Sequence, residues 1–258
     1  GGFNFVPGDI SATYEPEFDL SREVGVKAQW RLGQARFRTN VVGFYDTYSD
    51  IQQRISVTID NAIYSAVVNQ ARSVIKGIEL EQTIEPVDWA SLSLRYSHLL
   101  SKNKLDGYTP EYLAAACPAD PYVTAPDTSK ACPLNRIARL PRDSVDIDGT
   151  VILPLGDRVG EVSVTASFHY QSSQWSNDTN YITPDAYQKG YSLLNLSANW
   201  KSVFDTNFDL SLFMTNVTNN RYWASIGSVS EMGNLGVAQA TLGAPRMFGG
   251  ALTYRFGS

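Results

Sequence analysis

The stretch FGGALTYRF, residues 248–256, decides the fold, because its side chains alternate and the alternation stops almost at the end of the chain. Every second position is apolar, aromatic or glycine: Phe248, Gly250, Leu252, Tyr254 and Phe256. Residues two apart lie on the same face of a β-strand, so this set is predicted to form one face of a final strand. A chain that repeats this pattern builds an antiparallel sheet with one apolar face.

Further strips along the chain show the same alternation, with mostly polar or charged residues between the apolar ones. Each strip predicts one strand. Alternation alone fits a soluble β-sandwich, whose apolar face packs on a second sheet, and a membrane β-barrel, whose apolar face contacts lipid. The apolar positions are Val24, Val26, Ala28 and Trp30; Leu92, Leu94 and Tyr96; Val145, Ile147 and Val151; Val162, Val164, Ala166, Phe168 and Tyr170; Leu194, Leu196, Ala198 and Trp200; and Phe208, Leu210, Leu212 and Met214.

The composition limits the classes of protein to which the chain can belong. The chain has 258 residues, of which 43% are hydrophobic and 12% aromatic, enough for a large core or a large barrel. No stretch approaches the roughly 18 unbroken apolar residues of a membrane helix, so a helical membrane protein is excluded. The net charge of −5, with basic residues scattered along the chain, argues against nucleic acid as a partner.

The connections between the strips separate the sandwich from the barrel. Short and long connections alternate, which is typical of an outer-membrane barrel with tight periplasmic turns and long extracellular loops. The short connections are 32–34, 85–88, 154–158 and 202–206, and the long ones are 58–65, 102–139, 176–186 and 220–240.

Aromatic residues near the short connections support the barrel. Trp30, Trp200 and Phe208 lie at apolar positions within a few residues of a short turn, and Phe256 lies at the chain end. Such residues form the aromatic girdle of a membrane barrel, although bulky aromatics also fill sandwich cores. Trp89 has the opposite parity to Leu92, so its place beside a turn requires a bulge or another explanation.

The two cysteines indicate an oxidising compartment. Cys117 and Cys132 lie in the irregular segment 102–139, where we expect them to form a disulfide; two separate free thiols are the alternative. The chain begins GGFNFVPGD, without a visible signal peptide, so we expect either a processed protein or a piece of a longer one.

Seven motifs stand in an order that resembles the C-terminal half of TonB-dependent outer-membrane receptors. Each motif is weak alone, but the ordered series is specific and covers nearly the whole chain. The motifs are GGFNF (1–5), YEPEF (14–18), EVGVKAQW (23–30), FRTNVVGFYDTYSDIQ (37–52), VIKGIELE (74–81), FMTNVTNNRY (213–222) and GAPRMFGGALTYRF (243–256).

The resemblance implies an all-β fold, an antiparallel transmembrane β-barrel fragment in the outer membrane of a Gram-negative bacterium. Such receptors have an N-terminal plug, a TonB box and a barrel of about 22 strands. Residues 1–258 contain nine predicted strands and the tail of a tenth at Gly1–Phe5, hence about nine to ten strands, with the plug and the TonB box absent. Outer-membrane lipid, and TonB through the missing N-terminal region, are the implied partners. Gly257 and Ser258 depart from the family pattern, in which the last residue is usually aromatic.

The sequence contains no recognisable catalytic system. His98 and His169 are the only histidines, and neither has a Ser, Cys or acid at a spacing that implies a triad. No HExxH, CxxC, Walker or glycine-rich dinucleotide motif occurs, and no group has metal-site spacing. We therefore expect no enzymatic activity, no metal site and no cofactor.

If the chain belongs to such a receptor, ligand contacts come from residues near the outer rim and in the long loops. Arginines suit anionic ligands, and aromatic rings stack on catechols, sugars or corrin-like rings, although each residue could equally anchor a loop. The expected function is TonB-energised uptake of a scarce small molecule such as a ferric siderophore, cobalamin or an oligosaccharide. The alternatives are a passive porin and a secreted β-sandwich that binds a ligand. The candidate ligand-binding residues are Tyr112, Arg139, Arg142, Trp175, Tyr222 and Trp223.

Overall fold

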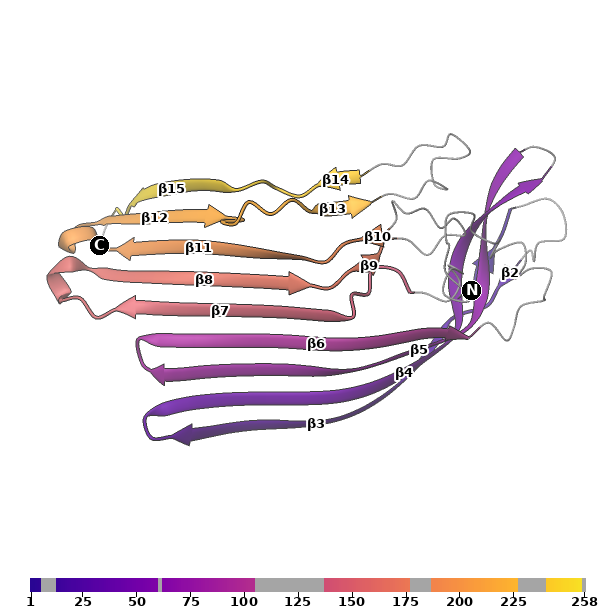
Figure 1. The fold of residues 1–258 in the computed structure, drawn as a ribbon, viewed down its shortest axis with the longest axis horizontal. Coiled ribbons are helices and arrows are strands. Elements are labelled where there is room, and N and C mark those ends of the chain that lie inside the picture. The colour runs from indigo at the N-terminus through magenta and orange to yellow at the C-terminus, as the bar shows by residue number, and fades with distance from the viewer. Residues whose placement is uncertain (6–12, 60–61, 105–136, 177–186, 227–239, 257–258) are drawn as a thin grey trace.

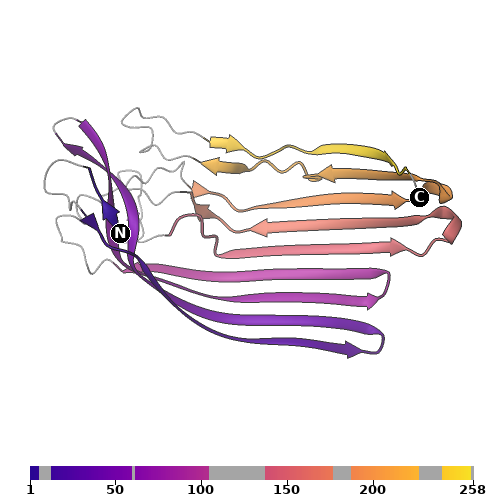
Figure 2. The same ribbon diagram turned by 180° about the vertical axis from the view of Figure 1, so that it is seen from behind.

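The computed structural model describes residues 1–5, 13–59, 62–104, 137–176, 187–226 and 240–256, and its main feature is one antiparallel sheet of nine strands (Figures 1 and 2). Each strand pairs with the next of these strands along the chain, as the alternating strips predict. The strands are β3 (Phe18–Leu32), β4 (Ala35–Ile59), β5 (Ala62–Val87), β6 (Ala90–Lys104), β7 (Asp143–Leu153), β8 (Glu161–Gln171), β11 (Tyr191–Lys201), β12 (Phe208–Thr215) and β15 (Met247–Tyr254).

The sheet has two distinct ends. At the end here called the turn end, short connections join the strands, and two of them contain the 3₁₀ turns η3 (Asp157–Val159) and η5 (Val203–Asp205). At the opposite end, the loop end, three small two-stranded sheets are added. They are β1 (Gly2–Phe3) with β2 (Thr13–Tyr14), β9 (Gln174–Trp175) with β10 (Tyr187–Gln188), and β13 (Trp223–Ile226) with β14 (Ala240–Leu242).

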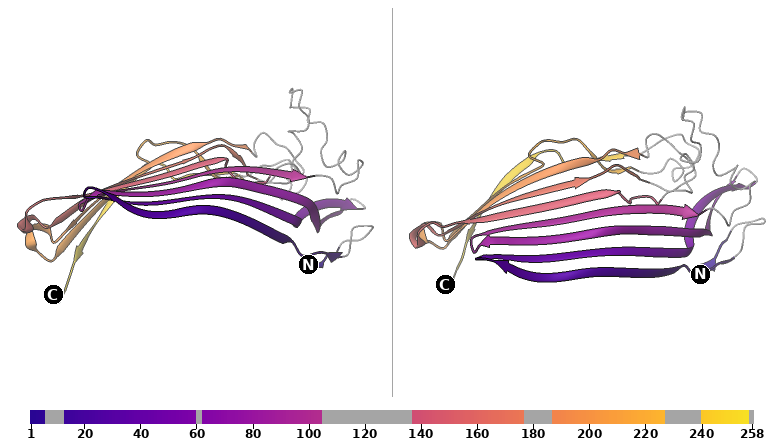
Figure 3. Two further views of the ribbon diagram at one scale, coloured as in Figure 1. Left: turned by 90° about the horizontal axis from the view of Figure 1, so that it is seen from below. Right: turned by 60° about the horizontal axis from the view of Figure 1, so that its bottom comes forward.

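The sheet is twisted and curved, and β3 and β15 form its two edges (Figure 3). The strands β3 and β15 do not pair with each other, so the sheet is an open part of a barrel wall. Among the described residues, no helix is long and apolar enough to cross a membrane.

The pairing register separates a polar face from an apolar face. Residues directly opposite each other in an antiparallel pair lie on the same face, so each transverse row of paired residues belongs to one face. One row of the polar face consists of Lys27, Asn40, Glu81, Arg95, Asp146 and His169. The adjacent row of the apolar face consists of Val26, Val41, Leu80, Tyr96, Val145 and Tyr170.

The predicted short connections are confirmed, one of them with a shift. Gly33 and Gln34 alone join β3 to β4. The connection expected at 85–88 is instead formed by Asp88 and Trp89, because β5 continues to Val87. The register of β5 against β6 shifts between Ile84 and Val87, so an irregularity does lie beside Trp89, but Trp89 itself belongs to the turn. Strand parity therefore does not apply to it.

Aromatic rings gather at the turn end. Trp30 stacks on Phe37 of the neighbouring strand, with ring centroids 3.9 Å apart. Phe208 and Tyr254 contact each other at 4.9 Å, and the rings of Tyr254 and Phe256 are 4.6 Å apart. Trp200 donates a hydrogen bond to the carbonyl of Val159 and contacts Phe204 edge-on. The predicted girdle residues thus lie together with further aromatics at this end.

The long loop predicted at 58–65 is wrong. Strands β4 and β5 stay paired out to Ile59 and Ala62, so they form one hairpin with strands of 25 and 26 residues. A membrane strand needs only about 9–11 residues, and Figure 1 shows this hairpin continuing past its neighbours and bending away. The β-branched and aromatic residues of ISVTI and AIYSAVV favour extended pairing, and the prediction underestimated them.

Gly1–Phe5, expected as the tail of a tenth barrel strand, does not join the nine-stranded sheet. Its strand β1 pairs with β2, and the Asn4 side chain forms two hydrogen bonds of 2.8 Å with the backbone of Val67 in β5. The Asn4 amide donates to a backbone carbonyl and accepts from a backbone N–H, as the backbone of a neighbouring strand would. These bonds attach the segment to the side of the β4–β5 hairpin.

The other long loops lie partly outside the described residues. Strands β13 and β14 occupy the two sides of the connection expected at 220–240. Cys117 and Cys132 lie outside the described residues, so their disulfide stays a prediction.

Candidate functional site at the loop end

A cavity of about 1170 Å³ lies at the loop end, where the chain enters β11 and where β13 and β14 pair. Its walls come from β10, β11, β13, β14 and the connections beside them, which lie side by side in Figures 1 and 2. Residues far apart in sequence therefore meet here. The polar and aromatic lining residues include Tyr187, Lys189, Tyr191, Arg221, Tyr222 and Trp223.

Stacked aromatic rings form one wall of the cavity. Tyr191 and Tyr222 are parallel within 23°, with centroids 4.4 Å apart. Tyr191 pairs with Gln171, two positions from the pair of Leu193 with His169, so it lies on the polar face of the sheet. Gly243 also lies against Tyr222, where a Cβ would clash with the tyrosine ring. The stacked tyrosines therefore lie over the polar face of the nine-stranded sheet.

Asparagine side chains fix the backbone beneath the cavity. Asn216 is 4% exposed and has a left-handed φ of 47°. Its Nδ2 donates to the carbonyls of Asn220 and Ala244 at 2.9 and 3.0 Å, and its Oδ1 accepts from the Asn220 N–H at 2.8 Å. Asn220 in turn donates to the carbonyl of Ser192 at 3.0 Å. These bonds tie the segment after β12 to the segment before β15 and to the start of β11.

Among the described residues that line the cavity, the two charged ones, Lys189 and Arg221, are both cationic. Lys189 and Arg221 are exposed, and within the described ranges neither forms an ion pair. Gln188 is 6% exposed, and its side-chain amide donates a hydrogen bond of 2.6 Å to the carbonyl of Trp223. This bond joins β10 to β13. Two cations without an ion-pair partner among the described residues, beside stacked aromatic rings, favour an anionic ligand with aromatic or planar groups.

The structure distributes the six predicted ligand-binding residues unevenly. Tyr222 and Trp223 line the cavity, and Trp175 contacts the lining residue Tyr187 with ring centroids 5.0 Å apart. Arg139 donates from Nε to the carbonyl of Ser176 at 3.2 Å, as a loop anchor does. Arg142 does not line the cavity, and its carbonyl accepts a hydrogen bond from the N–H of Leu99. Tyr112 lies outside the described residues.

Sequence reasoning missed Tyr187, Lys189, Tyr191 and Arg221, all of which line the cavity. The signal that could have found Tyr191 is its parity: it lies on the polar face, opposite to Leu194 and Leu196, at the start of a strand that follows a long loop. Arg221 stands directly before the predicted Tyr222 in the motif FMTNVTNNRY.

Comparison with known families assigns the fold to one class. Residues 2–219 match the model of the family described as TonB dependent receptor-like, beta-barrel. The chain belongs to this family. Its members are Gram-negative outer-membrane barrels, so the apolar face contacts lipid, the polar face lines the lumen, and the turn end is periplasmic.

Solved structures of TonB-dependent receptors share the fold. The ferric yersiniabactin uptake receptor FyuA from Yersinia pestis is 16% identical, with a TM-score of 0.65, over 97% of this chain and 32% of that one. The ferric-catecholate import receptor Fiu from E. coli K12 is 15% identical, with a TM-score of 0.62, over 98% and 29%. The copper transporter OprC is 13% identical, with a TM-score of 0.61, over 94% and 32%.

The chain therefore spans about a third of the length of these structures. A comparison with curated protein sequences finds no match.

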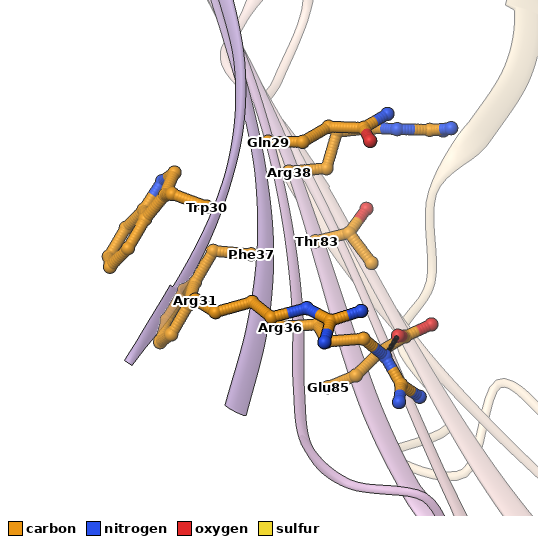
Figure 4. A pocket seen from close by; sticks show the side chains of 8 residues that line it. All are labelled: Gln29, Trp30, Arg31, Arg36, Phe37, Arg38, Thr83 and Glu85. Carbon is orange, nitrogen blue, oxygen red and sulfur yellow. Dashed lines mark hydrogen bonds and ion pairs between the residues drawn. The ribbon is translucent and has the colours of Figure 1, made fainter. Parts of the chain in front are cut away.

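At the periplasmic end of this receptor-family sheet, a second hollow of about 630 Å³ shows the two faces directly (Figure 4). Trp30 and Phe37 lie on the lipid side, while Arg36, Arg38 and Glu85 extend on the lumen side. Arg36 forms ion pairs with Glu85 at 2.7 Å and with Asp88 at 2.8 Å.

Each histidine has an aspartate partner that sequence spacing did not reveal. His169 Nδ1 lies 2.8 Å from Asp146 Oδ1 in the lumen, and His98 Nδ1 lies 2.7 Å from Asp143 Oδ1 on the lipid-facing side. Both contacts arise from cross-strand pairing of distant residues. In the described part of the chain, no group of three or more His, Cys, Asp or Glu side chains is arranged to hold a metal ion.

Proposed function

We propose that this chain is the C-terminal part of the barrel of an outer-membrane receptor that takes up a scarce small molecule with energy supplied through TonB. The remaining barrel strands, a plug and a TonB-binding segment would belong to parts of the receptor outside this chain. The observation that carries the proposal is the cavity at the extracellular end, which combines stacked tyrosines with the cations Lys189 and Arg221 on the lumen side.

The chemistry of the cavity favours an anionic metal chelate with aromatic groups, such as a ferric siderophore. Tyr191 and Tyr222 offer ring faces for stacking, and Lys189 and Arg221 offer charge to carboxylate, catecholate or phosphate oxygens. Two of the structures with this fold are described as receptors for iron chelates and a third as a copper transporter, which supports metal-linked cargo. Cobalamin and oligosaccharides are the competing ligands.

The test is a binding measurement on the intact receptor in detergent. Isothermal titration with a ferric catecholate, a ferric hydroxamate, cobalamin and a maltooligosaccharide should give measurable affinity for an iron chelate. The Lys189→Ala/Arg221→Ala variant should weaken that affinity about tenfold, equivalent to about 1.4 kcal/mol. Both side chains are exposed and free of ion pairs within the described ranges, so the variant should fold.

The matched control is Lys27→Ala/Arg31→Ala, which removes the same two residue types from the lumen face of β3, far from the cavity. This control should bind as the wild type does. Equal losses in both variants would show that the cavity does not bind the ligand. Absence of binding to all four compounds, together with unselective solute flux through reconstituted receptor, would favour a passive porin instead.

A further inference from the structure

On the lipid-facing side of β3, β4 and β5, the first charged residues above the periplasmic turns stand in a single transverse row. Arg22 pairs with Tyr45, and Tyr45 pairs with Lys76, so these residues lie side by side on one face. Between this row and the aromatic pair Trp30–Phe37, the same face carries no charged residue on these three strands. Arg22 and Lys76 are therefore the first charges on this face above the aromatic pair, and the apolar residues Leu20 and Val74 lie one row beyond them.

The height of this row agrees with the boundary of the outer leaflet. Arg22 lies eight positions before Trp30 along β3. At about 3.3 Å per residue and a strand tilt of about 40°, this corresponds to a height of about 20 Å. The apolar band of such barrels is about 25 Å tall, and long basic side chains extend several ångströms towards the polar side.

A hollow of about 530 Å³ lies directly below the two cations. Gly43 provides its floor, since a Cβ there would meet no heavy atom closer than 3.9 Å. Val24 and Ile78, which pair with Gly43 from both sides, are 79% and 54% exposed, and Leu100 completes the apolar border. The hollow is open towards the membrane.

No acidic group in the described part of the chain compensates Arg22 or Lys76 with an ion pair. The carboxylate on this side of the sheet, Asp143, is already bound by His98 at 2.7 Å and by the Tyr96 hydroxyl at 3.0 Å. Arg22 and Lys76 stand two strands apart, about 10 Å between backbones, so their flexible side chains can reach one phosphate from both sides.

We propose that this site binds one phosphorylated, acylated lipid of the outer leaflet, with its phosphate between Arg22 and Lys76 and an acyl chain in the hollow over Gly43. An apolar hollow does not explain the two cations in one row, and two cations alone do not explain the missing side chain at Gly43. An amphiphile with an anionic head above an acyl chain matches both features. The lipid is a bound partner of the barrel wall, separate from the cavity at the loop end.

The test is native mass spectrometry of the intact receptor in dodecyl maltoside, titrated with diphosphoryl lipid A and with the same lipid after its phosphates are removed. The wild type should bind the phosphorylated lipid about tenfold more tightly than the dephosphorylated one. The Arg22→Ala/Lys76→Ala variant should abolish this preference. Gly43→Leu, which fills the hollow without changing charge, should weaken binding of both lipids.

The control is Lys27→Ala/Arg38→Ala, which removes one lysine and one arginine from neighbouring positions on the opposite, lumen face. It should leave the phosphate preference intact. If both double variants lose the preference equally, or if the wild type shows none, the lipid site does not exist. A receptor dimer that disappears in Gly43→Leu would likewise overturn the proposal, because a second copy would then occupy the hollow.

Discussion

At the periplasmic end, Gly33 and Gln34 alone join β3 to β4, whereas at the extracellular end the chain from β12 to β15 is held by the side chains of asparagines. The periplasmic turn needs only a backbone conformation. The extracellular segment needs hydrogen bonds between residues such as Asn216 and Ala244, which are 28 positions apart. The Gly33–Gln34 turn is therefore determined locally, whereas the segment between β12 and β15 depends on contacts that form only when the sheet is assembled.

This difference has a functional counterpart. A ligand site needs side chains from several strands in a fixed arrangement, and the buried amide side chains at the extracellular end supply long-range bonds of this kind around a cavity. The periplasmic end carries exposed ion pairs and an aromatic ring system that suit a membrane boundary. If the two ends differ in this way, a substitution at the extracellular end should lower the free energy of unfolding more than one at the periplasmic end.

The largest effect is expected for Asn216→Ala. The substitution leaves the Asn220 N–H and the carbonyls of Asn220 and Ala244 without their side-chain partner in a position that is 4% exposed. We expect the free energy of unfolding to fall by about 3 kcal/mol, at roughly 1 kcal/mol per lost bond. Guanidinium unfolding of the intact receptor in lipid vesicles, followed by tryptophan fluorescence, measures it.

Asn219→Ala is the matched control, because Asn219 has a similar left-handed φ of 52° but is exposed and accepts one bond, 3.1 Å long, from the Arg246 N–H. Alanine in this left-handed conformation costs about the same at both positions. The difference between the two variants in free energy of unfolding therefore measures the buried hydrogen bonds of Asn216. Equal losses for Asn216→Ala and Asn219→Ala would mean that the asparagine bonds do not hold this segment.

An intermediate effect is expected at the periplasmic turn. Gly33 has a φ of 61°, and a Cβ there would meet no atom within 4 Å, so Gly33→Ala should cost only the left-handed backbone penalty of about 1 kcal/mol. Gly33→Asn should recover part of this loss, because asparagine tolerates that conformation. The same unfolding measurement applies, and a loss above about 3 kcal/mol for the alanine variant would contradict a purely local turn.

The two ends also differ in how far the sequence could predict them. Period-two alternation and the short turn at Gly33 depend on neighbouring residues, and the nine strands and the aromatic cluster around Trp30 followed from them. The stacking of Tyr191 on Tyr222 joins residues 31 positions apart, and it becomes visible only after the register of β11 and the position of β13 are known. For the same reason, the length of the β4–β5 hairpin was predicted wrongly and the His169–Asp146 contact was not predicted at all.

The smallest effect is expected for Arg36→Ala, which breaks the ion pairs with Glu85 and Asp88 at the periplasmic end. The Arg36 side chain is 44% exposed and that of Asp88 is 89% exposed, so water and salt screen both interactions. The loss should stay below about 1 kcal/mol and should shrink further in 1 M NaCl, while the Asn216→Ala loss should not depend on salt. The measurement is the same unfolding titration at two ionic strengths, with Glu85→Gln as a second variant that removes only the shorter pair. A large, salt-independent loss for Arg36→Ala would show that the periplasmic end is held by buried polar contacts, as the extracellular end is, and the contrast between the ends would then be lost.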